Sequence, residues 1–443
     1  MSESKINSAA FDAAFQNAFQ NLNAPTARER LDALATLVEL CPVAPSNGSD
    51  WSDVNNHIHT TYSFSPYSPA KAVWMARQAG LATAGIMDHD SVGGAREFIE
   101  AGRIARLPVT VGAEVRVSMA GTAFEGRRIN NPDQDTVIYV ALHGIPHSRI
   151  DAVEDYLKPI REKRAARGRA MAARLDAMLA PAGLGLDFDT DIVPISQWHD
   201  GGEITERHIL CAVAKKLLAK FGAGAELVGF LRGALGMEVG AKIEAMLTDA
   251  ANPFVEYDLL GAMKGTLVEK FFIPATDECP NIRDLAAFAN ANGIILAYAY
   301  LGDVTDSVTG DKKAQKFEDD YLDALFGDLA GIGFNAVTYM PSRNTRAQLE
   351  RVGKLCGRLG LFQISGEDIN QPRQKFVCEA MRDPFFAKLT DAAWALIGHE
   401  KLATRDLADA MFSPKTAAAF PALAARAAFY ADAARAGGEG GES

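Results

Sequence analysis

The sequence lacks the marks of several common protein classes. It has no uninterrupted apolar run of the roughly 18 residues that cross a bilayer, and no basic segment that leads into an apolar stretch at the N-terminus. Its five cysteines are widely spaced and form no CxxC pair, so nothing indicates a zinc knuckle and a reducing compartment is favoured. GxxxxGK[ST], GxGxxG and GxSxG are missing too, which leaves nucleotide-loop, dinucleotide and serine-hydrolase functions without a motif. We therefore expect a cytoplasmic protein with no membrane partner.

Positive charge is also in short supply. The 443 residues include 45 Lys and Arg against 56 Asp and Glu, a formal net charge of −11. This balance repels a phosphate backbone and predicts no nucleic-acid partner, but it is compatible with a small phosphorylated molecule. With 48% hydrophobic and 23% charged residues, the composition is that of a globular protein with a sizeable core. Histidine is scarce at 8 residues, so the places where it occurs are informative.

Short apolar runs alternate with helical stretches from about residue 54 onward. This pattern is typical of alternating strands and helices with a parallel sheet, and seven strands suit a closed or nearly closed barrel. The predicted strands are Val54–Ile58, Thr83–Met87, Pro108–Val115, Thr136–Leu142, Gly293–Ala299, Phe334–Tyr339 and Leu361–Ser365.

The regularity breaks in the middle of the chain and at both ends. Ile160–Leu179 and Ile204–Leu247, rich in Ala, Leu, Lys and Arg, predict the helices of an insertion. Thr416–Ala436 predicts a packing helix, and Gly437–Ser443 a frayed tail. The expected organisation is an N-terminal helical extension (1–50), a first part of the barrel (51–150), a helical insertion (151–290), a second part of the barrel (291–375) and a C-terminal helical extension (376–443).

Histidine and carboxylate residues close three consecutive predicted strands. In His57-Ile58-His59 the two histidines share one face of a strand, because strand side chains alternate, and can bind one metal ion together. Asp88-His89-Asp90 closes the second strand and Glu114 the third. Active sites of α/β barrels lie at the carboxyl ends of their strands. The three motifs together therefore predict a metal site on that rim, with Asp88 and Asp90 as partners that fix the histidine tautomers.

Four segments of the chain resemble motifs of the polymerase-and-histidinol-phosphatase (PHP) superfamily of metal-dependent phosphoesterases. They are His57-Ile58-His59-Thr60, Gly85-Ile86-Met87-Asp88-His89-Asp90, Gly112-Ala113-Glu114 and Ser365-Gly366-Glu367-Asp368. The resemblance covers residues 54–145 and 290–372, and the helical block between them resembles the insertion of small-molecule phosphatases. It implies a distorted seven-stranded (β/α) barrel that binds up to three divalent metals and hydrolyses phosphate esters.

The resemblance also implies that one metal site is complete and that two are lost. The complete site would consist of His57, His59, Glu114 and Asp368. The second site would need histidines where this chain has Tyr139 and Tyr298. The third would combine His89 with positions that are now Phe64 or Ser65, and Asn370. Two imidazoles and two carboxylates suit Zn, Mn or Fe, so we expect one divalent metal per chain.

With a single metal, side chains must take over the role of a second ion. Tyr139 and Tyr298 are candidates, because a phenol can donate a hydrogen bond to a developing oxyanion or act as a base. The alternative is that both merely fill space vacated by lost metals. His89 is a candidate general acid or substrate ligand, or else a hydrogen-bonding residue of the rim.

The insertion supplies further candidates for substrate binding. Small-molecule PHP phosphatases have an Arg-Pro-His motif at a helix start, and His208 aligns with its histidine. There the resemblance implies that Arg and His face the substrate phosphate. Here Glu206 occupies the arginine position and Arg207 replaces the proline. We expect Arg207, His208 and Asn370 to bind substrate, with His208 also available for catalysis. Lys264, Lys270 and Arg343 are interpreted as surface charges.

The sequence thus predicts a metal-dependent hydrolase that acts on a small phosphorylated substrate. One alternative is a mononuclear metallohydrolase whose substrate is not a phosphate ester. Another is a catalytically degenerate PHP domain that serves as a binding module. The terminal helical extensions are expected either to cover the barrel or to form the face of a homo-oligomer.

Overall fold

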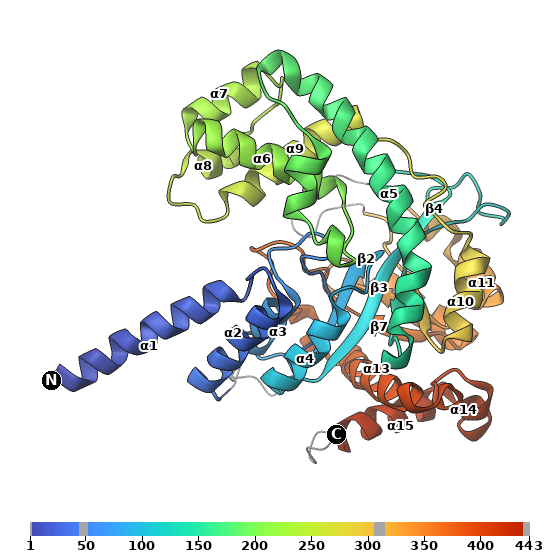
Figure 1. Ribbon diagram of the computed structural model, residues 1–443. Coiled ribbons are helices and arrows are strands. Elements are labelled where there is room, and N and C mark those ends of the chain that lie inside the picture. The colour runs from blue at the N-terminus through green and yellow to red at the C-terminus, as the bar shows by residue number, and fades with distance from the viewer. Residues whose placement is uncertain (1, 44–51, 305–314, 437–443) are drawn as a thin grey trace.

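The computed structural model describes residues 2–43, 52–304 and 315–436 and contains one seven-stranded sheet (Figure 1). The strands follow one another in chain order across the sheet, and all seven predicted strands are confirmed to within a few residues at their ends. They are β1 (Val54–Ile58), β2 (Thr83–His89), β3 (Val109–Ser118), β4 (Val137–His143), β5 (Ile295–Ala299), β6 (Ala336–Tyr339) and β7 (Phe362–Ser365).

The sheet curls into a nearly closed barrel. The chain just after β7 returns to β1, where the backbone N–H of His59 donates to the carbonyl of Ile369 at 2.9 Å. In return, the N–H of Ile369 donates to the carbonyl of His57 at 3.0 Å. The expected α/β barrel, with helical segments at both termini, is therefore present.

The expectation of a fully parallel sheet was wrong at β4, which runs antiparallel to both β3 and β5. The described connection between β3 and β4, residues 119–136, contains no helix, so the chain reverses without the crossover that parallel strands require. The pairing places Ala141 opposite Glu114 and Tyr139 opposite Arg116. The first half of β4 thus lies at the rim formed by the carboxyl ends of the other strands.

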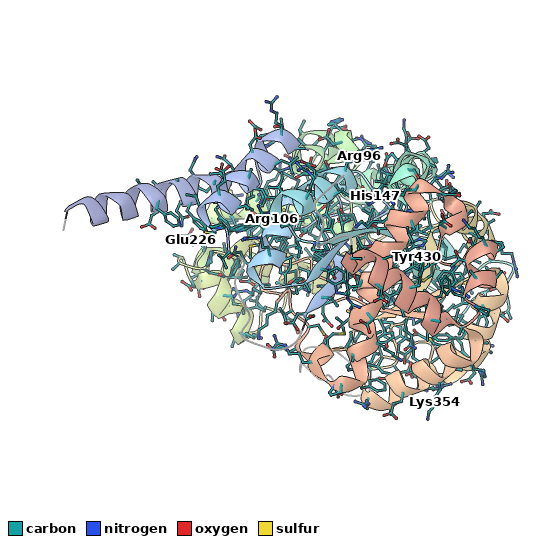
Figure 2. All side chains as sticks on the ribbon, turned by 90° about the horizontal axis from the view of Figure 1, so that it is seen from below. Arg96, Arg106, His147, Glu226, Lys354 and Tyr430 are labelled. Atoms are coloured by element: carbon teal, nitrogen blue, oxygen red, sulfur yellow. The ribbon has the colours of Figure 1, made fainter. Side chains whose placement is uncertain are left out.

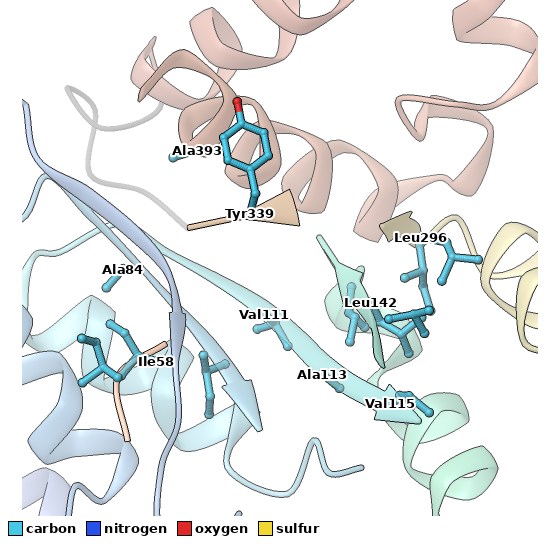
Figure 3. Close-up of a cluster of buried hydrophobic side chains, with 14 of the residues drawn as sticks. Ile58, Ala84, Val111, Ala113, Val115, Leu142, Leu296, Tyr339 and Ala393 are labelled. Carbon is cyan, nitrogen blue, oxygen red and sulfur yellow. The ribbon is translucent and has the colours of Figure 1, made fainter. Parts of the chain in front are cut away.

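Both faces of the barrel strands are apolar, as expected for a sheet covered on one side and filled on the other. Side chains on the outer face, including Ile58, Val111 and Leu142, pack against the surrounding helices (Figure 3). The inner face is filled by Met87, Ala141, Ile295, Ala297, Ala336 and Ile364.

Helix α13 (Ala387–Arg405) closes the amino-terminal end of the barrel. Leu396 belongs to the inner cluster, and the carboxylate of Glu400 accepts hydrogen bonds from the backbone N–H of Val111, at 2.7 Å, and from the hydroxyl of Thr110. The carboxyl-terminal rim stays open and can hold a site.

The other described helices outside the insertion lie around the barrel and at its closed end. They are α1 (Ser2–Asn21), α2 (Ala27–Leu40), α3 (Pro69–Gln78), α4 (Ala95–Ala105), α10 (Ile282–Ala291), α11 (Leu322–Ile332), α12 (Arg346–Leu359), α14 (Pro414–Ala419) and α15 (Leu423–Ala436). Helix α1 projects away from the body (Figures 1 and 2). The single helix predicted over 416–436 is split at Phe420-Pro421, because proline lacks the N–H that would continue it. The tail predicted over 437–443 lies outside the described residues.

The insertion forms a helical layer over the open rim (Figure 1). It has its own apolar cluster, and the predicted helical stretch 204–247 is broken at Gly222, where φ is +65°. Its helices are α5 (Ile150–Leu179), α6 (Glu206–Phe221), α7 (Ala225–Gly233), α8 (Ala241–Thr248) and α9 (Val255–Phe271). Across the described ranges, none of the helices is both long enough and apolar enough to span a membrane.

Candidate metal centre

A cavity of about 910 Å³ lies between the open rim and the insertion. Its walls come from β1 to β4, from α6 and α9 of the insertion, and from the segments that follow β5, β6 and β7. Of the residues predicted to form the site, those that line it are His57, His89, Glu114, Tyr139, Arg207 and Asp368.

The imidazoles of His57 and His59 converge on one point at the bottom of this cavity. Their Nε2 atoms lie 3.2 Å apart, and both rings are buried. Two nitrogens at bonds of 2.0–2.1 Å to one tetrahedral ion would be separated by about 3.3 Å. Burial lowers the pKa of His57, so its ring is neutral and offers a lone pair. The observed spacing fits a shared cation without rearrangement.

Carboxylates complete the donor set. An oxygen of Glu114 lies within 4.8 Å of both imidazole nitrogens, which makes these three residues a group able to hold a metal ion. Asp368 approaches from the segment after β7, with Oδ1 3.1 Å from His59 Nε2. Burial alone would lower the pKa of His59, but Asp368 raises it, so the space beside Nε2 favours a positive charge. Two imidazoles and two carboxylates form a donor set that suits a divalent transition metal.

A second layer of hydrogen bonds orients His59. Its Nδ1 lies 3.1 Å from the hydroxyl of Ser63, which in turn donates to Asp88 Oδ1 at 2.6 Å. Asp88 also accepts from the N–H and hydroxyl of Thr60, so its position is fixed. With Nδ1 engaged in this way, Nε2 faces the metal position. Ser63 was missed from the sequence, where its spacing of four residues from His59 carried no signal by itself.

The predicted tautomer-fixing role of Asp90 was wrong. Its Oδ2 accepts from Arg164 Nη1 on α5 at 2.5 Å, and its backbone has a φ of +47°, which turns the side chain toward the insertion. Asp90 therefore ties the rim to the insertion and does not contact a histidine of the site.

His89 and Tyr139 face the cavity beside this centre. His89 Nδ1 lies 2.9 Å from Glu114 Oε2, and burial lowers the pKa of His89 well below its usual value, so the ring beside that carboxylate is neutral. The ring of Tyr139 has its centroid 6.1 Å from that of His89. Burial raises the pKa of Tyr139 to about 12, so its hydroxyl keeps its proton and can donate it in a hydrogen bond.

Tyr298, the other predicted catalytic tyrosine, does not reach the cavity. It lies on the outer face of β5, against Phe326 of α11, and its hydroxyl donates to Glu318 Oε1 at 2.9 Å. The inward positions of this strand are Ala297 and Ala299. The prediction of a role at the site was wrong because it placed Tyr298 on the inner face, and the alternation of the strand puts it on the other.

Two further predictions need the same correction. His208 is buried, and its Nδ1 accepts the N–H of Thr205 at 3.0 Å in a capping box that starts α6, while its ring packs against Phe64. Asn370 is buried, and its Nδ2 donates to Asp368 Oδ1 at 2.5 Å. Neither residue lines the cavity, so His208 stabilises the helix start and Asn370 holds Asp368.

Arg207 and Lys264 bring positive charge to the cavity from the insertion. Among the described residues neither forms an ion pair. Desolvation lowers the pKa of Lys264, and the charge of Arg207 lowers it further, so the two cations lie near each other. Both also interact electrostatically with Asp368. Lys264 is thus a cavity residue, although its sequence surroundings suggested a surface charge.

A buried network of three arginines borders the cavity, and sequence reasoning did not identify it. Its arginines are Arg116 on β3 and Arg164 and Arg167 on α5, and its carboxyl groups belong to Asp90, Glu203, Glu206 and Glu278. The spacing Glu114-x-Arg116 on one strand was the available signal, since residues two apart share a face.

The fold and these residues define a nearly closed α/β barrel with a candidate metal-binding group at its open rim. No family model matches the chain, and no curated protein matches its sequence. Similar solved structures include a protein from Bifidobacterium adolescentis, provisionally described as a metal-dependent phosphoesterase, and an amidohydrolase from Chromobacterium violaceum with bound sulfate and no metal. Each is 19% identical over 74% of this chain and is covered over 94% and 90% of its own length, with TM-scores of 0.47 and 0.46.

Proposed function

We propose that this protein is a divergent PHP-type metal-dependent hydrolase that binds one dication and cleaves a small phosphate ester. The observation that carries the proposal is the convergence of His57 and His59, with their Nε2 atoms 3.2 Å apart, and Glu114 at the bottom of the cavity. Buried imidazoles that share one point with a carboxylate are costly unless a cation completes them. A dication bound there would act as a Lewis acid and lower the pKa of a coordinated water.

The preference for a phosphorylated substrate comes from the cavity walls. Arg207 and Lys264 line the cavity and form no ion pair with a described residue, although both lie close enough to Asp368 to interact with it electrostatically. Two unpaired cations match the charge of a phosphate monoester dianion. The volume of about 910 Å³ suits a small organic molecule, because pockets for such ligands measure some 300–1,000 Å³.

The reaction adds water across a P–O bond. The water oxygen becomes bonded to phosphorus, the ester P–O bond breaks, and the alcohol leaves with one of the water protons. The Tyr139 hydroxyl donates a hydrogen bond to a phosphoryl oxygen and Arg207 and Lys264 bind the others, while the neutral ring of His89 lies in the cavity wall with Nδ1 2.9 Å from Glu114.

Metal analysis of protein purified without added metal, paired with turnover of a panel of phosphate esters, tests this function. We expect about one metal ion per chain and hydrolysis of at least one ester. His59→Ala should lose both, and His199→Ala, which changes an exposed residue of a short 3-10 helix, should keep both. Metal-free protein that remains metal-free when offered Zn, Mn or Fe would refute the proposal. One metal with no phosphoesterase activity would refute the substrate class alone.

A further inference from the structure

Arg116 has no part in the metal-binding group and yet lines the cavity beside it. It lies two residues beyond Glu114 on β3, so the two side chains share the inner face of the strand. Across the sheet it stands directly opposite Tyr139, a pairing that brings Cβ atoms to about 4.5–5.5 Å. Burial raises the pKa of Tyr139, and the positive charge of Arg116 is the largest opposing influence, which agrees with this closeness.

Most of the hydrogen-bonding capacity of Arg116 is unused. Its Nη2 donates to Glu278 Oε1, whereas Nε is buried without a partner and Nη1 makes no hydrogen bond to any described residue. The side chain is 7% exposed, and what is exposed opens into the cavity. Burying a guanidinium whose N–H groups have no acceptor costs free energy, and an oxyanion would supply the missing acceptors.

The local charge balance leaves Arg116 attractive to an anion. Its carboxylate partner is shared, because Glu278 Oε2 also accepts from Arg167 Nε at 2.8 Å. Further along the network, Asp90 is paired with Arg164. Burial raises the pKa of Glu203 to about 8, so at pH 7 this carboxyl group is mainly protonated and neutralises little. Of the three arginines, Arg164 forms ion pairs with three carboxyl groups and Arg167 with two, whereas Arg116 forms one, so Arg116 has the fewest direct partners for its charge.

We infer that Arg116, together with the hydroxyl of Tyr139, binds a phosphoryl oxygen of the substrate and stabilises the negative charge that develops there. Phosphoesterases with two metals use the second ion for this purpose. In this chain the guanidinium of Arg116 and the phenol of Tyr139 lie on the inner face of the barrel next to Glu114. As hydrogen-bond donors they stabilise the same negative charge. The inference rests on the proposed function and adds the group that contacts the transferred phosphoryl.

Arg116→Gln and Arg167→Gln form a matched pair for the test. Each removes one of the two guanidiniums that contact Glu278, but Arg116 lines the cavity and Arg167 does not. We would measure bound metal, the affinity for inorganic phosphate by calorimetry with metal-free and metal-loaded protein, and kcat and KM for p-nitrophenyl phosphate.

We expect Arg116→Gln to bind phosphate at least about tenfold more weakly in both forms and to lose about 100-fold in kcat, with metal content unchanged. Arg167→Gln should stay within about threefold of wild type. Arg116→Lys keeps the charge and should recover part of the loss. If Arg116→Gln fails to fold, the double variant Arg116→Gln/Glu278→Gln takes its place in the test, because it removes both charges of the ion pair.

The failure of the inference differs from the failure of the proposed function. Equal losses in Arg116→Gln and Arg167→Gln, or phosphate binding unchanged in Arg116→Gln, would overturn the inference even if the wild type is an active phosphoesterase. A wild type without turnover, whose phosphate binding is weakened only by the Arg116 change, would overturn the function and support the inference. A wild type that neither binds phosphate nor hydrolyses esters would overturn both.

Discussion

Single hydrogen bonds in the second layer decide whether the histidine pair is ready for a cation. Ser63 connects His59 Nδ1 to Asp88 and thereby fixes which nitrogen of the ring faces the cavity. Partners of this kind hold the tautomer and the ring angle, and their loss commonly weakens metal affinity 10- to 100-fold.

Ser63→Ala is therefore expected to weaken metal binding by about 10- to 100-fold while the chain stays folded. A competition titration against a metal chelator measures this change. Ser65→Ala is the matched control, because the Ser65 hydroxyl is buried without a partner and contributes no hydrogen bond to the site. Equal affinities in the two variants would show that the Ser63 hydroxyl does not orient His59.

The two tyrosines should separate stability from turnover. Tyr298→Phe removes a hydroxyl that donates to the buried Glu318, which we expect to lower the free energy of unfolding by about 1 kcal/mol without changing kcat. Tyr139→Phe removes a hydroxyl that faces the cavity and has no partner among the described residues, so it should lower kcat and leave stability nearly unchanged. Urea unfolding and steady-state kinetics on both variants check this. A loss of kcat in Tyr298→Phe would show that the Tyr298 hydroxyl contributes to catalysis, against its assignment to the outer face of β5.

At the scale of elements, two helices of the C-terminal extension approach unusually closely. A Cβ added to Gly398 of α13 would lie 1.9 Å from the carbonyl oxygen of Tyr430 on α15. No real contact is that short, and the clashing atom belongs to the backbone, so the helices would have to separate. Since α13 closes the barrel at one end, the effect reaches the inner cluster.

Gly398→Ala should accordingly lower the free energy of unfolding by about 3 kcal/mol, the upper end of the usual range for overpacking. Gly357→Ala is the control, because Gly357 is a helical residue of α12 with open space around its Cα. There the helix propensity of alanine should stabilise the protein by up to about 1 kcal/mol. Thermal or urea unfolding of both variants gives the comparison, and destabilisation of similar size in each would contradict the close packing.

The strands and helices could be predicted from the sequence, but which side chains of a strand point into the barrel could not. Apolar runs and helix signals placed seven strands, and the alternation of side chains at the end of β1 correctly joined His57 with His59, the residue just beyond the strand. In β5 the same rule has no starting point, because both faces of a barrel strand are apolar and Ala297-Tyr298-Ala299 does not say which face is inside. The reversal at β4 and the pairs Ser63–Asp88 and Arg116–Tyr139 depend on contacts between separate segments, which no local pattern records.

For the whole molecule, buried titratable groups predict how stability changes with pH. Burial lowers the pKa values of His143 and His208 to about 3 and that of His399 to about 4, from an ordinary value of 6.5. At these three positions the unfolded chain binds more protons than the native one below pH 6.5, so their contribution to stability falls as the pH falls. Glu203 and Glu318 act oppositely. Burial raises their pKa values to about 8 and 7 from 4.5, so they stabilise the native state most below pH 4.5 and lose this contribution as the pH rises.

Between pH 6.5 and 5 all five groups contribute, and three imidazoles oppose two carboxyl groups. Each contributes about 1.4 kcal/mol per pH unit, so the contribution of a single group is large enough to be measured with a variant that does not titrate. His399→Asn isolates one term, because an amide oxygen can still accept the N–H of Met411 but does not titrate. Between pH 7 and 5 the variant should lose about 2 kcal/mol less than wild type in urea unfolding. An identical pH response in His399→Asn and wild type would mean that His399 is not held neutral by burial.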